Sequence, residues 1–215
     1  MPRVPLAMRR PDYSQSPRMF ESDLLDFFSR CHPLVVPALY VPGVLIALAE
    51  SARRTELSVV STVLLFGFGA VAWTLAEYWL HRLVFHFEGS SAVGKRLHFL
   101  AHGVHHHWPH DQYRLVMPPG VSIPLYGAFL GLFLAVLGGA GWAVQAGFVS
   151  GYAYYDLTHW WLHHGKPRSA YGRRLRRHHF LHHFKETNAR FGVSNPFWDK
   201  VFGTSGEPVV SRVEK

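Results

Sequence analysis

The chain has 215 residues and a net charge of +8 when its 16 histidines are neutral. No change in composition marks a second domain, so one domain over residues 1–215 is expected, and the positive charge favours an anionic partner, either nucleic acid or phospholipid. The single cysteine, Cys31, excludes an internal disulfide and a cysteine-based zinc finger.

The first predicted element is a short helix over residues 22–30, SDLLDFFSR, with Ser22 as its N-cap. Its apolar side chains share one face, as expected of a helix that lies in the membrane interface. They are Leu24, Leu25, Phe27 and Phe28. Residues 1–33 therefore form a predicted N-terminal segment in the cytosol or at the membrane surface.

Four long apolar stretches follow, at residues 34–49, 57–80, 121–140 and 142–162. A membrane-spanning helix needs roughly 17–25 apolar residues. The first stretch is short for that and contains Pro37 and Pro42, whereas the other three are long enough. Helices of a soluble bundle would show a polar stripe, and these hardly do. The sequence predicts an all-α integral membrane protein with about four transmembrane helices between residues 34 and 162.

The distribution of positive charge predicts the orientation. All but two of the 22 Lys and Arg residues lie in the N-terminal segment, in residues 81–117 or in residues 163–215; Arg53 and Arg54 are the exceptions. The positive-inside rule then places both termini, the intervening segment and a cap at residues 163–215 on the cytoplasmic side. The membrane is either a bacterial inner membrane or the endoplasmic reticulum. The basic run RRLRRHH at 173–179 favours anionic head groups over nucleic acid, because it lies between a span and a histidine cluster.

Four histidine clusters lie at or just beyond the cytoplasmic ends of the spans: HRLVFH, HGVHH, HWWLH and HFLHH. Their ten histidines are His81, His86, His102, His105, His106, His159, His163, His179, His182 and His183. Residues four apart share one face of a helix, so 102 with 106, 159 with 163, and 179 with 183 can each bind one metal, while 105 and 182 reach a second metal. A loose metal-sequestering surface would not need such spacing. The pattern predicts a dimetal site with five imidazoles for each metal.

Three further polar residues are placed to support these ligands. Glu77 lies one turn before His81, and Asp156 lies just before His159. Either carboxylate can accept the second N–H of a ligating imidazole and so fix its tautomer. His98, four residues before His102, is a third candidate for this supporting role.

These features resemble the fatty acid hydroxylase family of membrane-bound, histidine-rich diiron enzymes, and most of all its fatty acid 2-hydroxylases. The resemblance runs from about residue 77 to 204 and includes EYWLHRLVFH, LHFLAHGVHHHWPHDQYRLVMPP, YDLTHWWLHH, HHFLHHF and FGVSNPFWDKVFG. It implies that one metal is held by His81, His86, His102, His106 and His182. It implies that the other is held by His105, His159, His163, His179 and His183.

The resemblance also implies chemistry: two iron ions, which zinc can replace in isolated protein, and O₂ as co-substrate. The expected reaction is 2-hydroxylation of a fatty acyl chain that is free, thioester-bound or part of a sphingolipid. Larger relatives carry a fused cytochrome domain for which this chain has no room, so a separate electron donor of cytochrome or ferredoxin type is expected. Hydroxylation or desaturation of a sterol or carotenoid stays open. A non-enzymatic metal-binding or transport protein is the other alternative, although the middles of the spans have almost no ionisable groups for transport.

Overall fold

The computed structural model describes residues 16–206, and every regular element in that range is a helix. The elements in chain order are α1 (Asp23–Phe28), α2 (Val35–Arg54), α3 (Val59–Trp79), a π-helix at Leu80–Phe85, α4 (Ala92–His98), a π-helix at Phe99–Gly103, α5 (Val104–His107), α6 (Pro119–Leu137), a 3₁₀ turn at Gly138–Ala140, α7 (Gly141–His164), α8 (Ala170–Phe184) and α9 (Phe197–Val201). The predicted all-α class is confirmed.

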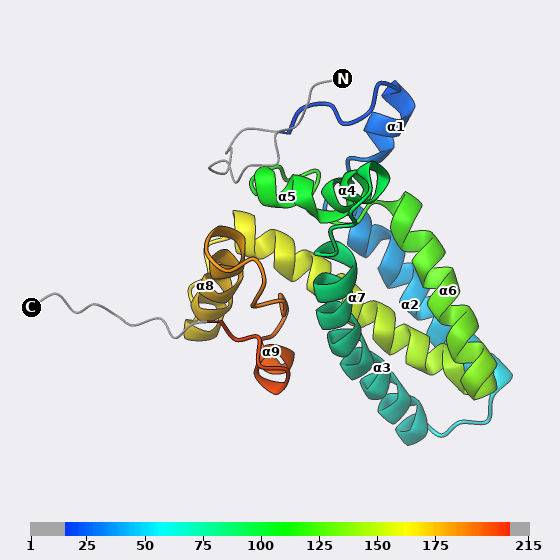
Figure 1. Cartoon of the computed structure of the whole chain (residues 1–215). Helices are drawn as coiled ribbons and strands as arrows, with labels where there is room; N and C mark the ends of the chain where they lie inside the picture. The colour runs from blue at the N-terminus through cyan, green and yellow to red at the C-terminus, as the bar shows by residue number, and fades with distance from the viewer. Residues whose placement is uncertain (1–15, 207–215) are drawn as a thin grey trace, which may run out of the picture.

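Three helical runs are long and apolar enough to cross a membrane: Val35–Arg54, Val59–Phe85 and Pro119–His164. In the third run, α6 and α7 join at the 3₁₀ turn and fold back into a hairpin (Figure 1). The apolar stretches read from the sequence coincide with α2, α3, α6 and α7. A membrane protein is thus supported, and the exact number of crossings stays a prediction.

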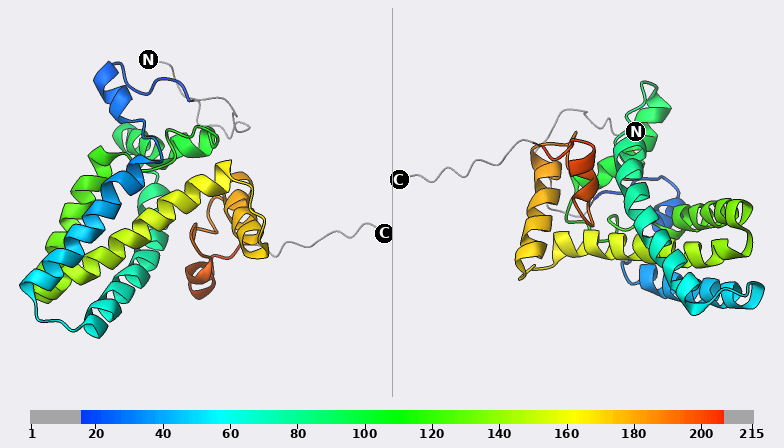
Figure 2. Two further views of the ribbon diagram at one scale, coloured as in Figure 1. Left: turned by 180° about the vertical axis from the view of Figure 1, so that it is seen from behind. Right: turned by 90° about the horizontal axis from the view of Figure 1, so that it is seen from below.

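The four long helices pack side by side, with α7 in contact with α2, α3 and α6 (Figure 2). Aromatic rings fill the space between them. Trp73 of α3 lies 5.1 Å from Phe148 and 5.2 Å from Tyr152 of α7, measured between ring centroids. Tyr40 of α2 meets Tyr152 at 4.9 Å. Many large apolar side chains on the outside of the bundle are exposed, as expected where lipid covers them.

Helices α3 and α7 approach each other closely because two glycines lie at their contact. A Cβ atom on Gly69 would come within 2.0 Å of the carbonyl oxygen of Val144, and one on Gly147 within 1.8 Å of that of Phe66. Small residues commonly allow membrane helices to pack at this distance. The contact fixes the relative position of the two helices whose C-terminal ends lead into or carry histidines of the clusters.

The first two helices differ in part from their predicted form. Ser22 caps α1 as expected, accepting a hydrogen bond from the Leu25 amide. The predicted first span was shorter than α2, which continues through Pro42 as far as Arg54. Its last turn gains from Glu50, which pairs with Arg53 at 2.7 Å and also with Arg54, and such pairs stabilise helix ends.

The other helices lie on the side of the bundle away from the α6–α7 turn. There α8 crosses the end of α7, with α9 beneath it and α5 nearby (Figure 1). Buried Leu175 and Val193 join the cluster of apolar side chains that runs through the bundle. The fold therefore brings the ends of α3 and α7 together with α5 and α8.

Candidate metal centre

The ten predicted histidines lie in two groups of five. The first histidine set is His81, His86, His102, His106 and His182, and the second histidine set is His105, His159, His163, His179 and His183. Within each set, one ring nitrogen from every residue lies within 4.8 Å of all the others. All ten side chains are buried except those of His86 and His106, which are half-buried. The grouping is the same as the predicted partition between two metals.

In the first set the rings are joined through their Nε2 atoms. The Nε2 atom of His102 lies 3.0 Å from that of His81 and 2.9 Å from that of His106. The Nε2 atoms of His86 and His81 are 3.2 Å apart. The Nε2 atom of His182 is buried and has no hydrogen-bond partner among residues 16–206. Such a convergence of nitrogens is a donor set that suits a divalent transition metal.

The second set is built in the same way from α5, α7 and α8. The Nε2 atoms of His159 and His105 are 2.9 Å apart. The Nε2 atom of His179 lies 2.8 Å from that of His163 and 3.1 Å from that of His183. The two sets adjoin: His106 and His183 stack with their centroids 4.1 Å apart. The residues present therefore fit two neighbouring metal ions.

A π-helix explains the five-residue spacing of His81 and His86. In an α-helix two residues five apart point in different directions. Here the chain changes from α3 to a π-helix at Leu80–Phe85, and the His86 amide donates to the carbonyl of His81 at 3.1 Å. The wider turn brings both rings into one set, 4.9 Å apart between centroids. Single π-helical turns of this kind often occur at functional sites.

A second π-helix, at Phe99–Gly103, separates His98 from His102. Because of it, the spacing of four residues does not place His98 on the face of the first set as an α-helix would. His98 instead lies beside the set, with its ring 6.4 Å from that of His86, and it belongs to neither group of five. Its position near a ligand is consistent with a supporting role, which stays a prediction.

Burial lowers the pKa of those imidazoles of the two sets that lie outside the spans. The pKa of His182 falls to about 4 and that of His86 to about 3, because burial disfavours the charged ring and neighbouring histidines add to the effect at His86. The pKa values of His102, His106 and His183 lie well below the ordinary value for the same two reasons. These rings are therefore neutral at physiological pH, as metal ligands must be.

Backbone carbonyls fix the tautomer of two ligands in the first set. The Nδ1 atom of His81 lies 2.5 Å from the carbonyl oxygen of Phe191, and that of His182 lies 2.7 Å from the carbonyl oxygen of Ala189. A carbonyl only accepts, so each Nδ1 carries the proton and each Nε2 keeps a free lone pair. This arrangement directs the lone pairs toward the centre of the set.

The prediction that Glu77 accepts an imidazole N–H is wrong. Its carboxylate is buried, but it accepts from the backbone amides of Val193 at 2.8 Å and Ser194 at 2.7 Å, and from the Ser194 hydroxyl. The segment after α8 lies against the end of α3. Its backbone amides and the Ser194 hydroxyl donate to the Glu77 oxygens that were expected to accept from His81. Glu77 therefore holds the backbone at residues 193 and 194, two residues beyond the Phe191 carbonyl that His81 contacts.

Asp156 differs from its predicted role in a similar way. It is buried in α7, and its Oδ2 atom accepts from the amide of Met117 at 3.2 Å rather than from a described imidazole. The residue therefore joins α7 to the irregular segment that precedes α6. His159, three residues later in α7, has no hydrogen-bond partner for its Nδ1 atom among residues 16–206.

Sequence reasoning gave no role to Asp199 of α9, which is fully buried. Its Oδ1 atom accepts from the Phe191 amide at 2.8 Å, and its Oδ2 atom accepts from the Gly192 amide at 2.8 Å and contacts His178 at 3.0 Å. The signal for it was a lone carboxylate within the aromatic stretch FGVSNPFWDKVFG. The carbonyls of Ala189 and Phe191 left no signal, because every residue type has one.

The comparisons with known proteins agree with this architecture. A family model described as fatty acid hydroxylase matches residues 66–204. The chain is 38% identical to the dihydroceramide fatty acyl 2-hydroxylase FAH2 of Arabidopsis thaliana, with 88% of this chain and 80% of the relative covered. It is 37% identical to the fatty acid 2-hydroxylase of Rattus norvegicus, with 87% and 56% covered, so it spans about half of that longer relative.

A solved structure agrees as well. The hydroxylase domain of full-length scs7p superposes with a TM-score of 0.82 at 37% identity, covering 87% of this chain and 72% of that one. The match by sequence extends over most of the chain, and the match by structure includes the arrangement of its helices. The chain therefore belongs to the fatty acid hydroxylase family.

Proposed function

We propose that the protein is an O₂-dependent lipid hydroxylase that adds a hydroxyl group at carbon 2 of a fatty acyl chain. The observation that supports this most strongly is the pair of adjacent five-histidine sets at the ends of membrane-type helices. The relatives named above are 2-hydroxylases of fatty acids or dihydroceramide fatty acyl chains. The acyl chain of the substrate is free, bound as a thioester or part of a sphingolipid.

The first histidine set would hold one iron ion and the second histidine set the other. Iron bound there supplies the redox chemistry with O₂ and two electrons that insertion of an oxygen atom into a C–H bond requires. Zinc fits the same nitrogens but has no redox chemistry, so it is expected only in isolated protein. The electrons come from a separate donor of cytochrome or ferredoxin type.

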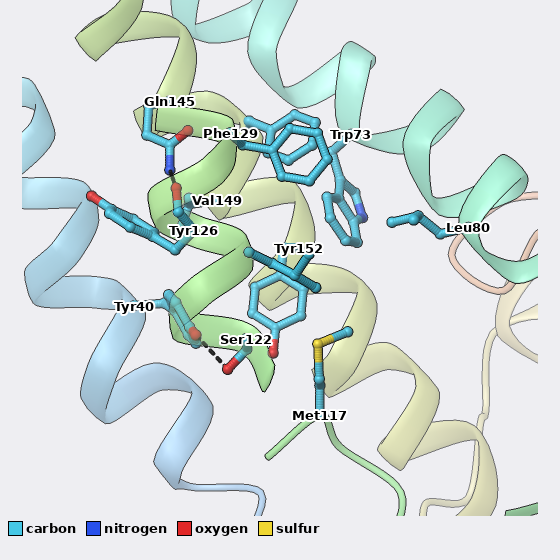
Figure 3. Close-up of a pocket in the computed structure, with 12 residues that line it drawn as sticks. Tyr40, Trp73, Leu80, Met117, Ser122, Tyr126, Phe129, Gln145, Val149 and Tyr152 are labelled. Carbon is cyan, nitrogen blue, oxygen red and sulfur yellow. Dashed lines mark hydrogen bonds between the residues drawn. The ribbon is translucent and has the colours of Figure 1, made fainter. Parts of the chain in front are cut away.

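An apolar pocket between the long helices is suited to receive the acyl chain. Its walls include Trp73, Phe129, Val149 and Tyr152, and Figure 3 shows these side chains around one space. Leu80, which directly precedes His81, also lines it. A chain that enters from the bilayer into this pocket thus approaches the first set without passing through water.

Two polar side chains in the pocket wall donate hydrogen bonds to other residues of the wall. The Tyr40 hydroxyl donates to Ser122 at 2.6 Å, and the Gln145 amide donates to the carbonyl of Tyr126 at 3.1 Å (Figure 3). Three other polar atoms of the wall, Trp73 Nε1, Gln145 Oε1 and the Tyr152 hydroxyl, are buried without a hydrogen-bond partner among residues 16–206, within an otherwise mostly apolar lining. Such a lining binds the hydrocarbon part of a lipid and leaves its head group to the cap side.

We also propose that the histidine sets and both termini lie on the cytoplasmic side, in a bacterial inner membrane or the endoplasmic reticulum. Phospholipid surrounds the bundle, and the exposed apolar residues of α1 lie in its surface. All four of these side chains, Leu24, Leu25, Phe27 and Phe28, are more than half exposed. A donor protein would then reach the centre from the cytoplasm.

The function is tested by lipid profiling with gas chromatography and mass spectrometry. Cells that express the intact chain with an electron donor are compared with cells that express His106→Ala, which removes one imidazole of the first set. We expect new 2-hydroxy acyl chains only with the intact chain, while the variant still inserts into the membrane. An unchanged lipid profile with metal-loaded protein would contradict acyl 2-hydroxylation, and sterols or carotenoids would then be tested.

A further inference from the structure

Residues 189–194 form a short stretch between α8 and α9, which we call the carbonyl segment. Its first carbonyl, at Ala189, accepts from His182, and its third, at Phe191, accepts from His81. The residue between them, Arg190, has φ 64°, a left-handed conformation that is uncommon outside glycine. This conformation turns the backbone so that both carbonyls point at imidazoles of the same set.

Two buried carboxylates from different helices hold the carbonyl segment. Asp199 of α9 accepts from the amides of Phe191 and Gly192, each at 2.8 Å. Glu77 of α3 accepts from the amides of Val193 and Ser194 at 2.8 and 2.7 Å. Four consecutive backbone amides thus donate to two carboxylates, and the carbonyls on this segment face the histidines.

The close packing at Gly192 shows how tightly the segment is held. A Cβ atom there would lie 2.1 Å from the carbonyl oxygen of Asn195 and 2.8 Å from the Oδ2 atom of Asp199. Any side chain would push the segment away from its carboxylate. The Thr204 amide and hydroxyl also donate to Asp199, at 2.7 Å to its carbonyl and 2.8 Å to its Oδ1 atom, so the carboxylate itself is fixed.

The second histidine set lacks such support among residues 16–206. The Nδ1 atoms of all five of its members are buried and have no hydrogen-bond partner in that range. These members are His105, His159, His163, His179 and His183. The two sets therefore have the same number of imidazoles, but among the described residues only the first set has rings whose Nδ1 atoms are held by backbone carbonyls.

We propose that Glu77 and Asp199 are positioning residues for the first set alone, and that they act through the carbonyl segment. By holding the carbonyls of Ala189 and Phe191 in place, they keep the Nε2 lone pairs of His182 and His81 directed at one metal. Hydrogen-bond partners of this kind typically change metal affinity 10–100-fold. The inference rests on the proposed function in so far as it takes the first set to be a metal site.

The test measures Zn²⁺ affinity of metal-free, full-length protein in detergent by competition with a chromogenic chelator. Asp199→Asn and Glu77→Gln keep the size of each side chain but replace acceptor oxygens with an amide. Each is made in two backgrounds. His105→Ala/His163→Ala disables the second set, and His86→Ala/His106→Ala disables the first. Asp111→Asn is the control, because Asp111 is equally buried but accepts from Ser16 and Tyr113.

We expect Asp199→Asn and Glu77→Gln to weaken Zn²⁺ binding about 10–100-fold where only the first set is intact. Where only the second set is intact, affinity should be unchanged within about twofold, since the carbonyls of Ala189 and Phe191 accept from imidazoles of the first set. Asp111→Asn should change neither. Equal weakening in both backgrounds would mean a general loss of structure and would overturn the proposal. No weakening in either background would also overturn it.

A milder variant keeps the test decisive if Asp199→Asn fails to fold, as judged by circular dichroism. Ser194→Ala removes one hydroxyl donor to Glu77 and leaves the backbone amides in place. It should weaken the first set by a smaller factor and leave the second unchanged, and an equal loss in both sets would again overturn the proposal. Wild-type protein that binds two metals but hydroxylates no lipid would contradict the proposed function, not this inference.

Discussion

An imidazole binds a metal through the nitrogen that carries no proton, so its second nitrogen decides whether it is ready to bind. In the first set, backbone carbonyls accept from the Nδ1 atoms of His81 and His182, so the proton stays on Nδ1 and Nε2 is free to bind. Crowding contributes as well, because each buried ring lowers the pKa of its neighbours. At the scale of the residue, the imidazoles are thus kept neutral, and the Nε2 atoms of His81 and His182 carry no proton before any metal arrives.

This neutrality predicts how the metal-free protein responds to pH. The pKa of His86 is about 3 and that of His182 about 4 when folded, against roughly 6.5 in an unfolded chain. Between these values the unfolded state binds more protons, so the free energy of unfolding rises with pH. The stability is fully present above about pH 6.5 and is lost as pH falls toward the folded values, at about 1.4 kcal/mol per pH unit for each such imidazole.

The measurement is the melting temperature of the metal-free protein in detergent, followed by circular dichroism from about pH 7.5 down to about pH 5. A falling melting temperature is expected across that interval. Bound metal competes with protons for the same nitrogens, so the melting temperature of metal-loaded protein should begin to fall only at a lower pH. A metal-free protein whose melting temperature does not change over this range would refute the prediction.

At the scale of the element, small changes of helix geometry decide which side chains meet. Two π-helical turns place His86 with His81 and move His98 out of line with His102. The glycine contact between α3 and α7 fixes the distance between the helices that carry His81 and His159. The site therefore depends on features in the helices below it as well as on its ligands.

The glycine contact can be tested with matched substitutions. Gly69→Ala or Gly147→Ala places a methyl group against a backbone carbonyl, and overpacking of this kind typically costs about 1–3 kcal/mol. We expect a melting temperature lower by about 2–10 °C, together with reduced metal content. Gly127→Ala in α6 is the control, since a Cβ there meets nothing within 4 Å. A control as destabilised as Gly147→Ala would show that helix packing is not the cause.

Sequence patterns predicted the helices, and the family resemblance implied the grouping of histidines that the structure has, but neither predicted the hydrogen bonds around them. The length of the apolar stretches was enough to find α3, α6 and α7, because an apolar stretch of about 20 residues is typical of a membrane-spanning helix. Spacing was enough for His102 with His106, whose separation matches an α-helix. Glu77 was misassigned because its partners, Val193 and Ser194, lie far along the chain and donate through backbone amides that no residue type reveals.

At the scale of the whole molecule, the distribution of arginines over the two ends of the bundle predicts which end faces the cytoplasm. α8 carries most of the cap's arginines, and it lies at the opposite end of α7 from the α6–α7 turn (Figure 1). Arg53 and Arg54 end α2, next to that turn. A bundle inserted with α8 toward the cytoplasm satisfies the positive-inside rule and places the histidines on the same side.

Cysteine labelling tests this orientation. Cys31 is buried, with 3% of its surface exposed, so the wild-type chain should react little. In intact bacterial cells, a membrane-impermeant maleimide should label Arg53→Cys but not Arg173→Cys. After lysis it should label both. Labelling of Arg173→Cys in intact cells, with Arg53→Cys protected until lysis, would reverse the assigned orientation.

Both histidine sets draw ligands from α8: His182 completes the first, and His179 and His183 complete the second. During synthesis α8 leaves the ribosome after α3, α6 and α7, so neither set is whole until the helical hairpin has been made and inserted. With metal bound as proposed, its capture is a late step of biogenesis, and its binding energy would add to the stability of a bundle that has already assembled.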